Sequence, residues 1–232
     1  MSDQDAETGS EQVERGAEPA GTPGERRGSR LAYVAHEVRN PLSTALWSSE
    51  LLGRLSAAER GGARGQKLAA LCLRSLVRLR TLVEDHFLAE RLDAGGLPQE
   101  QEVMVLAERL REAASRRPAG SGAIEVAVDE GLLVVADRFL LDRLLDALLG
   151  VAGGGGAAAR VAGSMQGESV AVRVRGAPPP PWGLDDPLRG AAPDPSGRAL
   201  SLPVARRAAE AVGGSLRIED GEYVLSLPGR AG

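Results

Sequence analysis

The sequence predicts two folded parts: a helical hairpin that pairs with a second copy into a four-helix bundle, and an α/β sandwich after it. Apolar residues recur at alternating steps of three and four on both sides of Gly61-Gly62, as in packed helix pairs. Beyond residue 103, short alternating segments are interspersed with amphipathic helices, the pattern of a mixed sheet covered by helices. A chain of 232 residues is long enough for two small domains and a tail.

The first segment lacks large apolar side chains. Residues 1–28 are polar, acidic and rich in Gly and Glu. Such a segment cannot bury enough surface to offset the entropy of ordering it. We therefore expect a disordered tail over residues 1–28.

Residues 29–96 are predicted to form the hairpin, and Ala94-Gly95-Gly96 ends it. Each helix carries one row of seam residues. The first row is Leu31, Ala35, Val38, Leu42, Ala45, Ser49 and Leu52, and the second is Leu68, Cys72, Ser75, Leu79, Leu82, His86 and Ala89. One hairpin cannot cover these narrow apolar stripes alone, so we expect a homodimer.

Residues 97–102 are predicted to be a linker, and residues 103–230 an α/β sandwich. Asp137 is placed to cap a leucine-rich helix that the glycines at 153–156 terminate. The other expected helices span 103–116 and 200–212, the expected strands are 124–128, 132–135, 158–162, 169–174, 215–218 and 223–227, and a long irregular loop spans 176–198.

The first helix carries the run His36-Glu37-Val38-Arg39-Asn40-Pro41-Leu42. Because Ala35 is a seam position, His36 should face outward, where a phosphoryl donor can approach the imidazole in line. Glu37 is placed to hold the other ring nitrogen and accept its proton. Asn40 follows one turn later on the same face, where its amide could orient a water. A lone exposed histidine is usually only solvated, but this combination predicts a phosphoacceptor.

The run resembles the H-box of sensor histidine kinases. Residues 31–96 as a whole are similar to the dimerisation and phosphoacceptor domain of that family. The resemblance implies that His36 accepts a phosphoryl group and exchanges it with an aspartate of a response regulator receiver domain. It also implies that Asn40 supports the reverse, phosphatase direction.

Residues 103–230 follow the order of elements in the family's ATP-binding domain, but the nucleotide-binding motifs differ. Alignment with the family's N-box places Gly150 at the asparagine that binds Mg²⁺, with Asp146 at the earlier asparagine. Glycine has no oxygen for a metal. Arg175 stands where the family has the adenine-reading aspartate, and a guanidinium cannot accept the adenine amino hydrogen.

The second glycine-rich loop remains only as residues 197–202, with Ala199 at its central glycine. We therefore expect no bound ATP, no other cofactor and no metal site in this chain. Mg²⁺ would come from the response regulator, and ATP would bind only under the alternative that the protein is a kinase.

Composition argues against several other classes of protein, among them nucleic-acid-binding, membrane and disulfide-bonded proteins. The net charge of −4 gives no indication of nucleic-acid binding. No apolar run approaches the ~20 residues that span a bilayer, no signal peptide is recognisable, and there is no room for an upstream sensor module. One cysteine, Cys72, excludes an internal disulfide and favours the cytoplasm. Cys72 and His86 are interpreted as bundle residues, and Trp182 as a loop residue covering the sheet.

Three functions remain open from the sequence. The leading hypothesis is a cytoplasmic histidine phosphotransferase, with possible phosphatase activity, acting on response regulators through His36. The second is a soluble histidine kinase in which Asp146 or another carboxylate replaces the lost Mg²⁺ ligand. The third is a non-catalytic pseudokinase adaptor, for which replacing His36 would have no effect.

Overall fold

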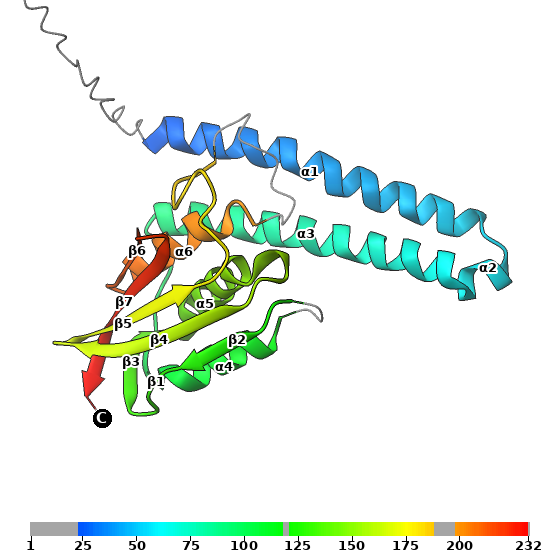
Figure 1. The fold of residues 1–232 in the computed structure, drawn as a ribbon. Helices are drawn as coiled ribbons and strands as arrows, with labels where there is room; N and C mark the ends of the chain where they lie inside the picture. Colours follow the sequence, from blue (N-terminus) through cyan, green and yellow to red (C-terminus); the bar gives the residue numbers. More distant parts are fainter. Residues whose placement is uncertain (1–22, 118–120, 188–197, 232) are drawn as a thin grey trace, which may run out of the picture.

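The computed structural model describes residues 23–117, 121–187 and 198–231. Its first part is a hairpin of two long helices, α1 (Pro23–Arg54) and α3 (Ala63–Asp93), joined through the short α2 (Ala57–Gly61) (Figure 1). The sequence did not predict α2. Ser56 starts it with a capping box, in which its side chain accepts from the Glu59 amide and the Glu59 side chain bonds back to the Ser56 amide.

Helix α1 begins before the predicted boundary of the tail. It starts at Pro23, whereas residues 1–28 were expected to be disordered. Proline is favoured at the first helical position, and the Glu and Arg residues that follow are good helix formers. Residues 1–22 lie outside the described part of the chain, so for them the expected disorder stays a prediction.

The two predicted rows of seam residues differ in how far their side chains are buried. All positions of the α3 seam are buried or half-buried. On α1, Val38, Ala45 and Leu52 follow the prediction, but Leu31, Ala35, Leu42 and Ser49 are exposed. In the single chain α1 instead packs through a neighbouring row that is buried against α3: Val34, Pro41, Ala45, Ser48 and Leu55. One partner helix covers only one side of the apolar stripe.

The second part is a seven-stranded sheet in the order β1-β3-β7-β5-β4-β2, with β6 paired to β7. Among the strands of the described residues, only β2 and β4 pair in parallel. The strands are β1 (Gln101–Val105), β2 (Ile124–Ala127), β3 (Leu132–Asp137), β4 (Ala159–Gln166), β5 (Ser169–Arg175), β6 (Ser215–Glu219) and β7 (Glu222–Ala231). The helices are α4 (Leu106–Ser115), α5 (Arg138–Ala152) and α6 (Ser201–Ala211), with one 3-10 turn, η1 (Gly154–Gly156).

Most predicted elements of this part are confirmed. Asp137 caps α5 by accepting from the Leu140 amide at 3.0 Å, β4 and β5 pair as expected, and Gly213, at a φ of 81°, follows α6. The helix expected over 103–116 is corrected, because it begins as strand β1. Val103 and Val105 favour strand, and β1 pairs antiparallel with β3 from Gln101 onward.

The α/β domain is docked on the hairpin, with α6 lying between α3 and the sheet (Figure 1). A group of five charged residues, here called the ionic junction, joins four segments. Arg30 of α1 is fully buried and pairs with Glu90 and Asp93 of α3 and with Asp186. Arg207 of α6 pairs with Asp93 and Asp186, each at 2.7 Å. The junction thus holds the start of α1 and the end of α3 against the second domain.

Candidate functional site

His36 lies on α1 with an exposed side chain. One turn before it, Tyr33 and Val34 are buried in the hairpin, and Pro41 is buried within the helix beyond it. These flanking contacts fix the rotation of α1 and direct the intervening His36 toward solvent. The outward placement predicted from the seam is therefore present, although the buried row is not the one predicted.

Glu37 is half-buried and faces the other helix of the hairpin. Arg78 of α3 donates from Nη2 to its Oε2 at 3.1 Å. The expectation that Glu37 holds the ring of His36 receives no support from this arrangement, because consecutive helical residues do not face each other. Arg78 was not identified from the sequence. The pair ties α1 to α3 directly beside the exposed imidazole.

Asn40 is exposed one helical turn after His36. Residues four apart lie on the same helix face, so the imidazole and the amide share one open surface. The side chains of His36 and Asn40 are thus both accessible to a protein that approaches α1 from solvent.

A small apolar cluster lies beside this surface and links it to the second domain. Tyr33 and Val34 of α1 and Leu82 of α3 are buried against Ala199 and Leu200. The segment that aligns with the family's second glycine-rich loop is therefore partly occupied in packing against the hairpin. Trp182 also packs on this cluster, which corrects the interpretation that it covers the sheet.

Asp85 of α3 reinforces the contact. It accepts hydrogen bonds from Ser201 Oγ at 2.6 Å and from Arg143 Nη2 at 2.7 Å. Burial raises the pKa of its carboxyl, and the Ser201 hydrogen bond and the charge of Arg143 oppose that shift. The N-terminus of α6 and the middle of α5 are thereby bound to the same point on α3.

Gly150, the residue that aligns with the family's Mg²⁺-binding asparagine, has the side chain of Arg198 packed against it. An ideal Cβ on Gly150 would lie 2.2 Å from Arg198 Nη1, so the guanidinium occupies the space a side chain would need. The next residue, Val151, also lacks a ligand oxygen, so a one-residue shift of the alignment changes nothing here.

The two charged side chains at the other aligned positions are bound to protein partners. Asp146 accepts from Arg116 Nη2 at 2.9 Å and from Arg116 Nε at 3.1 Å. Arg175 pairs with Glu222 at the start of β7. Each side chain thus has an ion-pair partner within the second domain.

A second arginine lies beside Arg198 at the end of α5. Arg117 donates to the carbonyls of Gly122 at 2.6 Å and Gly153 at 2.8 Å. Burial and the neighbouring charge of Arg198 lower the pKa of the Arg117 guanidinium. Sequence reasoning missed both arginines, and their only signal was the glycines at 150 and 153 against which they pack.

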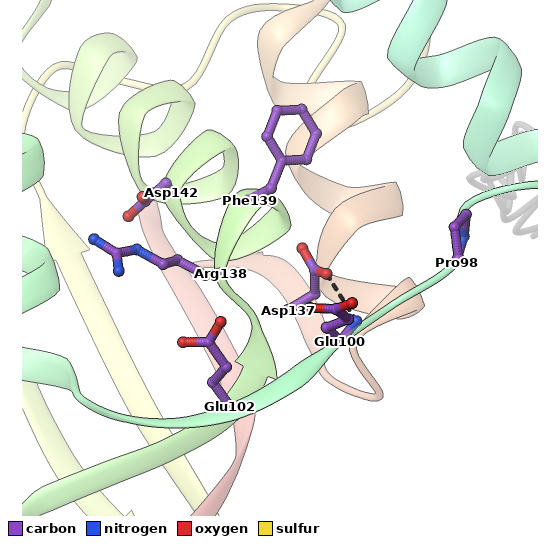
Figure 2. A pocket seen from close by; sticks show the side chains of 7 residues that line it. All are labelled: Pro98, Glu100, Glu102, Asp137, Arg138, Phe139 and Asp142. Atoms are coloured by element: carbon purple, nitrogen blue, oxygen red, sulfur yellow. Dashed lines mark hydrogen bonds between the residues drawn. The ribbon is translucent and has the colours of Figure 1, made fainter.

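A pocket of about 510 Å³ opens at the opposite end of α5, where β1 meets the first turns of the helix (Figure 2). Its lining is four carboxylates, one guanidinium and two apolar residues: Glu100, Glu102, Asp137, Asp142, Arg138, Pro98 and Phe139. Gly150 follows Asp137 by thirteen residues along α5, a rise of roughly 20 Å. The pocket is therefore distinct from the aligned nucleotide positions.

Cys72 and His86, the other residues singled out from the sequence, are both half-buried on α3. Cys72 is half-buried, and its Sγ donates to the Ala45 carbonyl at 3.6 Å. His86 is half-buried with its ring 5.8 Å from that of Phe87. Within residues 23–117, 121–187 and 198–231, no group of three or more His, Cys, Asp or Glu side chains could hold a metal. In the same ranges, no helix combines the length and apolar character needed to cross a membrane.

Comparison with known proteins gives a family match for the first part of the chain and a fold match that includes the second part. Residues 26–95 match the family model of the His Kinase A (phospho-acceptor) domain. The structure is similar to the Acinetobacter baumannii histidine kinase AdeS, with a TM-score of 0.56 and 16% identity over 83% of this chain and 97% of that one. No protein with a curated description is detectably similar in sequence.

Full-length ShkA, solved in complex with AMPPNP, is a second structural match. Its TM-score is 0.53 at 21% identity, and the alignment covers 88% of this chain but 46% of ShkA. At such identities the two structural matches show a shared fold, and the family model adds the phosphoacceptor domain at the level of sequence.

Proposed function

The chain belongs to the sensor histidine kinase family, with a phosphoacceptor domain followed by the fold of the kinase catalytic part, and we propose that it acts as a histidine phosphotransferase. His36 would take a phosphoryl group from the aspartate of one response regulator receiver domain and pass it to another. The cytoplasm, where receiver domains work, is part of the proposal.

The observation that carries the proposal is the contrast between the two sites. His36 is exposed beside Asn40 in an intact H-box run. At the positions aligned with nucleotide contacts, Arg198 fills the space next to Gly150, and Asp146 is bound to Arg116. These residues do not fit Mg·ATP, so a donor other than ATP is the simpler source of the phosphoryl group.

The transfer needs only groups that His36 and a receiver domain supply. The Nε2 lone pair of a neutral imidazole attacks the phosphorus of the partner's aspartyl phosphate in line. The nitrogen–phosphorus bond forms as the bond from phosphorus to the carboxylate oxygen breaks, and the aspartate leaves with the electron pair. The phosphoimidazolium then loses its ring proton to solvent or returns the phosphoryl group to a second aspartate. Mg²⁺ held by the receiver domain neutralises the phosphoryl oxygens.

A homodimer through the hairpin is part of the same proposal. Each α1 leaves large apolar side chains open on the side next to the buried row, and α3 does the same. Those on this side that are more than 40% exposed are Leu31, Leu42 and Leu46 of α1 and Leu73, Leu76, Val77 and Phe87 of α3. A patch of this kind marks an interaction site on a soluble helical pair.

The test compares two phosphoryl donors on the same sample. Receiver domains charged with ³²P-acetyl phosphate should transfer acid-labile label to the wild type and not to His36→Ala, whereas Mg·[γ-³²P]ATP should label neither. Labelling of His36 by ATP would identify a soluble histidine kinase instead. Labelling by neither donor would leave the adaptor, and then His36→Ala should have no effect on signalling in cells.

A further inference from the structure

Strand β1 forms one edge of the sheet in the second domain. Among the strands of the described residues it pairs only with β3, antiparallel and over its whole length from Gln101 to Val105. Alternate residues of a strand direct their backbone N–H and C=O groups to opposite sides, so the outer side of β1 keeps a row of unpaired groups. β1 lies at the end of the second domain remote from α1 (Figure 1).

The two faces of β1 carry different side chains. Met104 is buried in the core, so Glu102, two residues earlier, points to the same helix-covered side. On that side Glu102 lines the pocket at the start of α5 (Figure 2). Val103 points to the opposite face and is 52% exposed. A strand added to this edge would therefore meet a carboxylate on one face and an apolar side chain on the other.

The charge of the pocket comes mainly from two glutamates. Asp137 already accepts hydrogen bonds from two backbone amides, and Asp142 lies 3.7 and 3.9 Å from two arginines outside the pocket. Glu100 and Glu102 are exposed, and neither has an ion pair among the described residues. Arg138, the one cation of the lining, forms none there either, so no contact neutralises the two glutamates.

An aromatic ring forms the apolar part of the pocket. Phe139, the second residue of α5, is 54% exposed, and Pro98 adds a second apolar surface. A guanidinium or ammonium group placed over an aromatic face is attracted by the negative charge of that face. The stem of a long basic side chain also packs on apolar surface while its head stays with the carboxylates. The pocket thus suits an arginine or lysine side chain.

We propose that β1 binds an extended, basic segment of a partner protein, which adds to the sheet as a further strand and places one arginine or lysine in this pocket. Backbone hydrogen bonds along the edge supply affinity, and the pocket supplies specificity. The alternation on β1 calls for a basic residue facing Glu102, flanked by β-branched residues facing Val103.

Charge also decides against a second copy of this chain as the occupant. Another β1 would bring its own Glu100 and Glu102 to the same edge, where like charges repel. A basic strand meets the opposite situation, because its charge complements the two glutamates. The site is separate from His36, so the inference does not depend on the phosphotransferase activity.

The first experiment measures binding of the fluorescent pentapeptide Thr-Val-Arg-Val-Thr to the full chain by anisotropy. The dissociation constant should rise about 10-fold for Glu102→Gln and for Phe139→Ala, as for the loss of one important contact. Glu168→Gln, which removes an exposed carboxylate between β4 and β5, is the matched control and should change nothing. No binding at about 1 mM peptide, or equal binding to the wild type, Glu102→Gln and Phe139→Ala, would overturn the proposal.

The second experiment separates strand addition from attraction between charges. Two versions of the peptide carry N-methyl groups, one on both valines and the other on the arginine and the last threonine. Only alternate N–H groups face the neighbouring strand, so one version should bind about 10-fold more weakly and the other should keep its affinity. Amide NMR signals of β1 should shift with the unmodified peptide, and those of β2, at the opposite edge, should not. Equal affinity of the two methylated versions, or shifts at β2 instead, would refute the added strand.

Discussion

His36 and Glu37 are adjacent in sequence but lie in different surroundings. The first is open to solvent, and the second is half-buried and bonded to Arg78. Consecutive residues of a helix point in directions about 100° apart, so the two side chains have different surroundings. The imidazole is presented to solvent, while the neighbouring carboxylate fixes the position of the helix that presents it.

Asn40 gives the most direct residue-level prediction. If its amide orients the water that attacks the receiver domain's aspartyl phosphate, Asn40→Ala should slow dephosphorylation of that domain by about 10²-fold. Transfer to His36 should change less than twofold, because the imidazole needs no water. Loss of label from a charged receiver domain measures the first rate. Ser43→Ala, an exposed polar neighbour on α1, is the control, and an equal loss in both variants would contradict the role.

Tyr223 gives a residue-level prediction about stability. Its hydroxyl is buried in β7 with no hydrogen-bond partner among the described residues, and burial raises its pKa from 10.0 to about 12. Tyr223→Phe should therefore leave stability unchanged or raise the free energy of unfolding by about 1 kcal/mol at pH 8.

The sign of the pH effect follows from the raised pKa. The contribution of Tyr223 is fully present below the unfolded-state value near 10 and is lost as the pH rises through about 12. Urea unfolding at pH 8, 10 and 11 should show the wild type losing more stability than Tyr223→Phe at the highest pH. A variant that is clearly less stable at pH 8 would mean that the hydroxyl has a partner.

At the scale of elements, two arginine side chains pack against glycines at the end of α5. Arg198 packs on Gly150, and Arg117 packs on Gly153 and binds its carbonyl. The two glycines provide room for the guanidinium groups, and Arg117 satisfies a carbonyl that the end of a helix leaves open. The two guanidinium groups thus occupy the space that side chains at positions 150 and 153 would need.

This packing makes Gly150 and Arg198 mutually dependent. Gly150→Asn should lower the free energy of unfolding by about 1 kcal/mol, because its Cβ would displace the guanidinium. In an Arg198→Ala background the same substitution should cost much less, and urea denaturation of the four proteins measures the coupling. Additive effects would show that Arg198 moves away freely. Gly154→Asn is the control, since a Cβ there meets no atom within 4 Å.

At the scale of the whole molecule, buried charge holds the two domains together. The ionic junction contains three carboxylates and two guanidinium groups. Burial raises the pKa of Asp93, but the hydrogen bonds and charges of Arg207 and Arg30 lower it by more, so its pKa lies below the ordinary value. The junction depends on both arginines for its balance of charge.

Removing Arg30 should therefore open the contact between the domains. Arg30→Ala leaves Glu90, Asp93 and Asp186 with one guanidinium, and breaking a buried pair costs about 3–5 kcal/mol. Backbone amides around Tyr33 should exchange hydrogen faster, and Trp182 emission should move to longer wavelength. The strands β4, β5 and β7 should keep their protection. Arg39→Ala, exposed on α1, is the control, and unchanged exchange in Arg30→Ala would contradict the junction's role.

The periodic parts of the chain could be predicted because local chemistry decides them. The α3 seam, the Asp137 cap, the β4–β5 pair and the glycines after α6 all depend on neighbours within a few residues. The start of α4 could not be placed in the same way. Residues 101–102 were expected in the linker and 103–105 in the helix over 103–116, and only pairing with β3, some thirty residues away, makes 101–105 a strand.

The sequence by itself determined the two-part fold, the order of elements and the candidate phosphoacceptor His36, since spacing and side-chain chemistry specify all three. Only the tertiary structure decided the partners of the charged and small residues. Glu37 faces Arg78 and not His36, Arg198 fills the space at Gly150, and Arg30 is buried among three carboxylates from two segments. These contacts join residues far apart in the chain, and no local pattern records which charges meet when the domains pack.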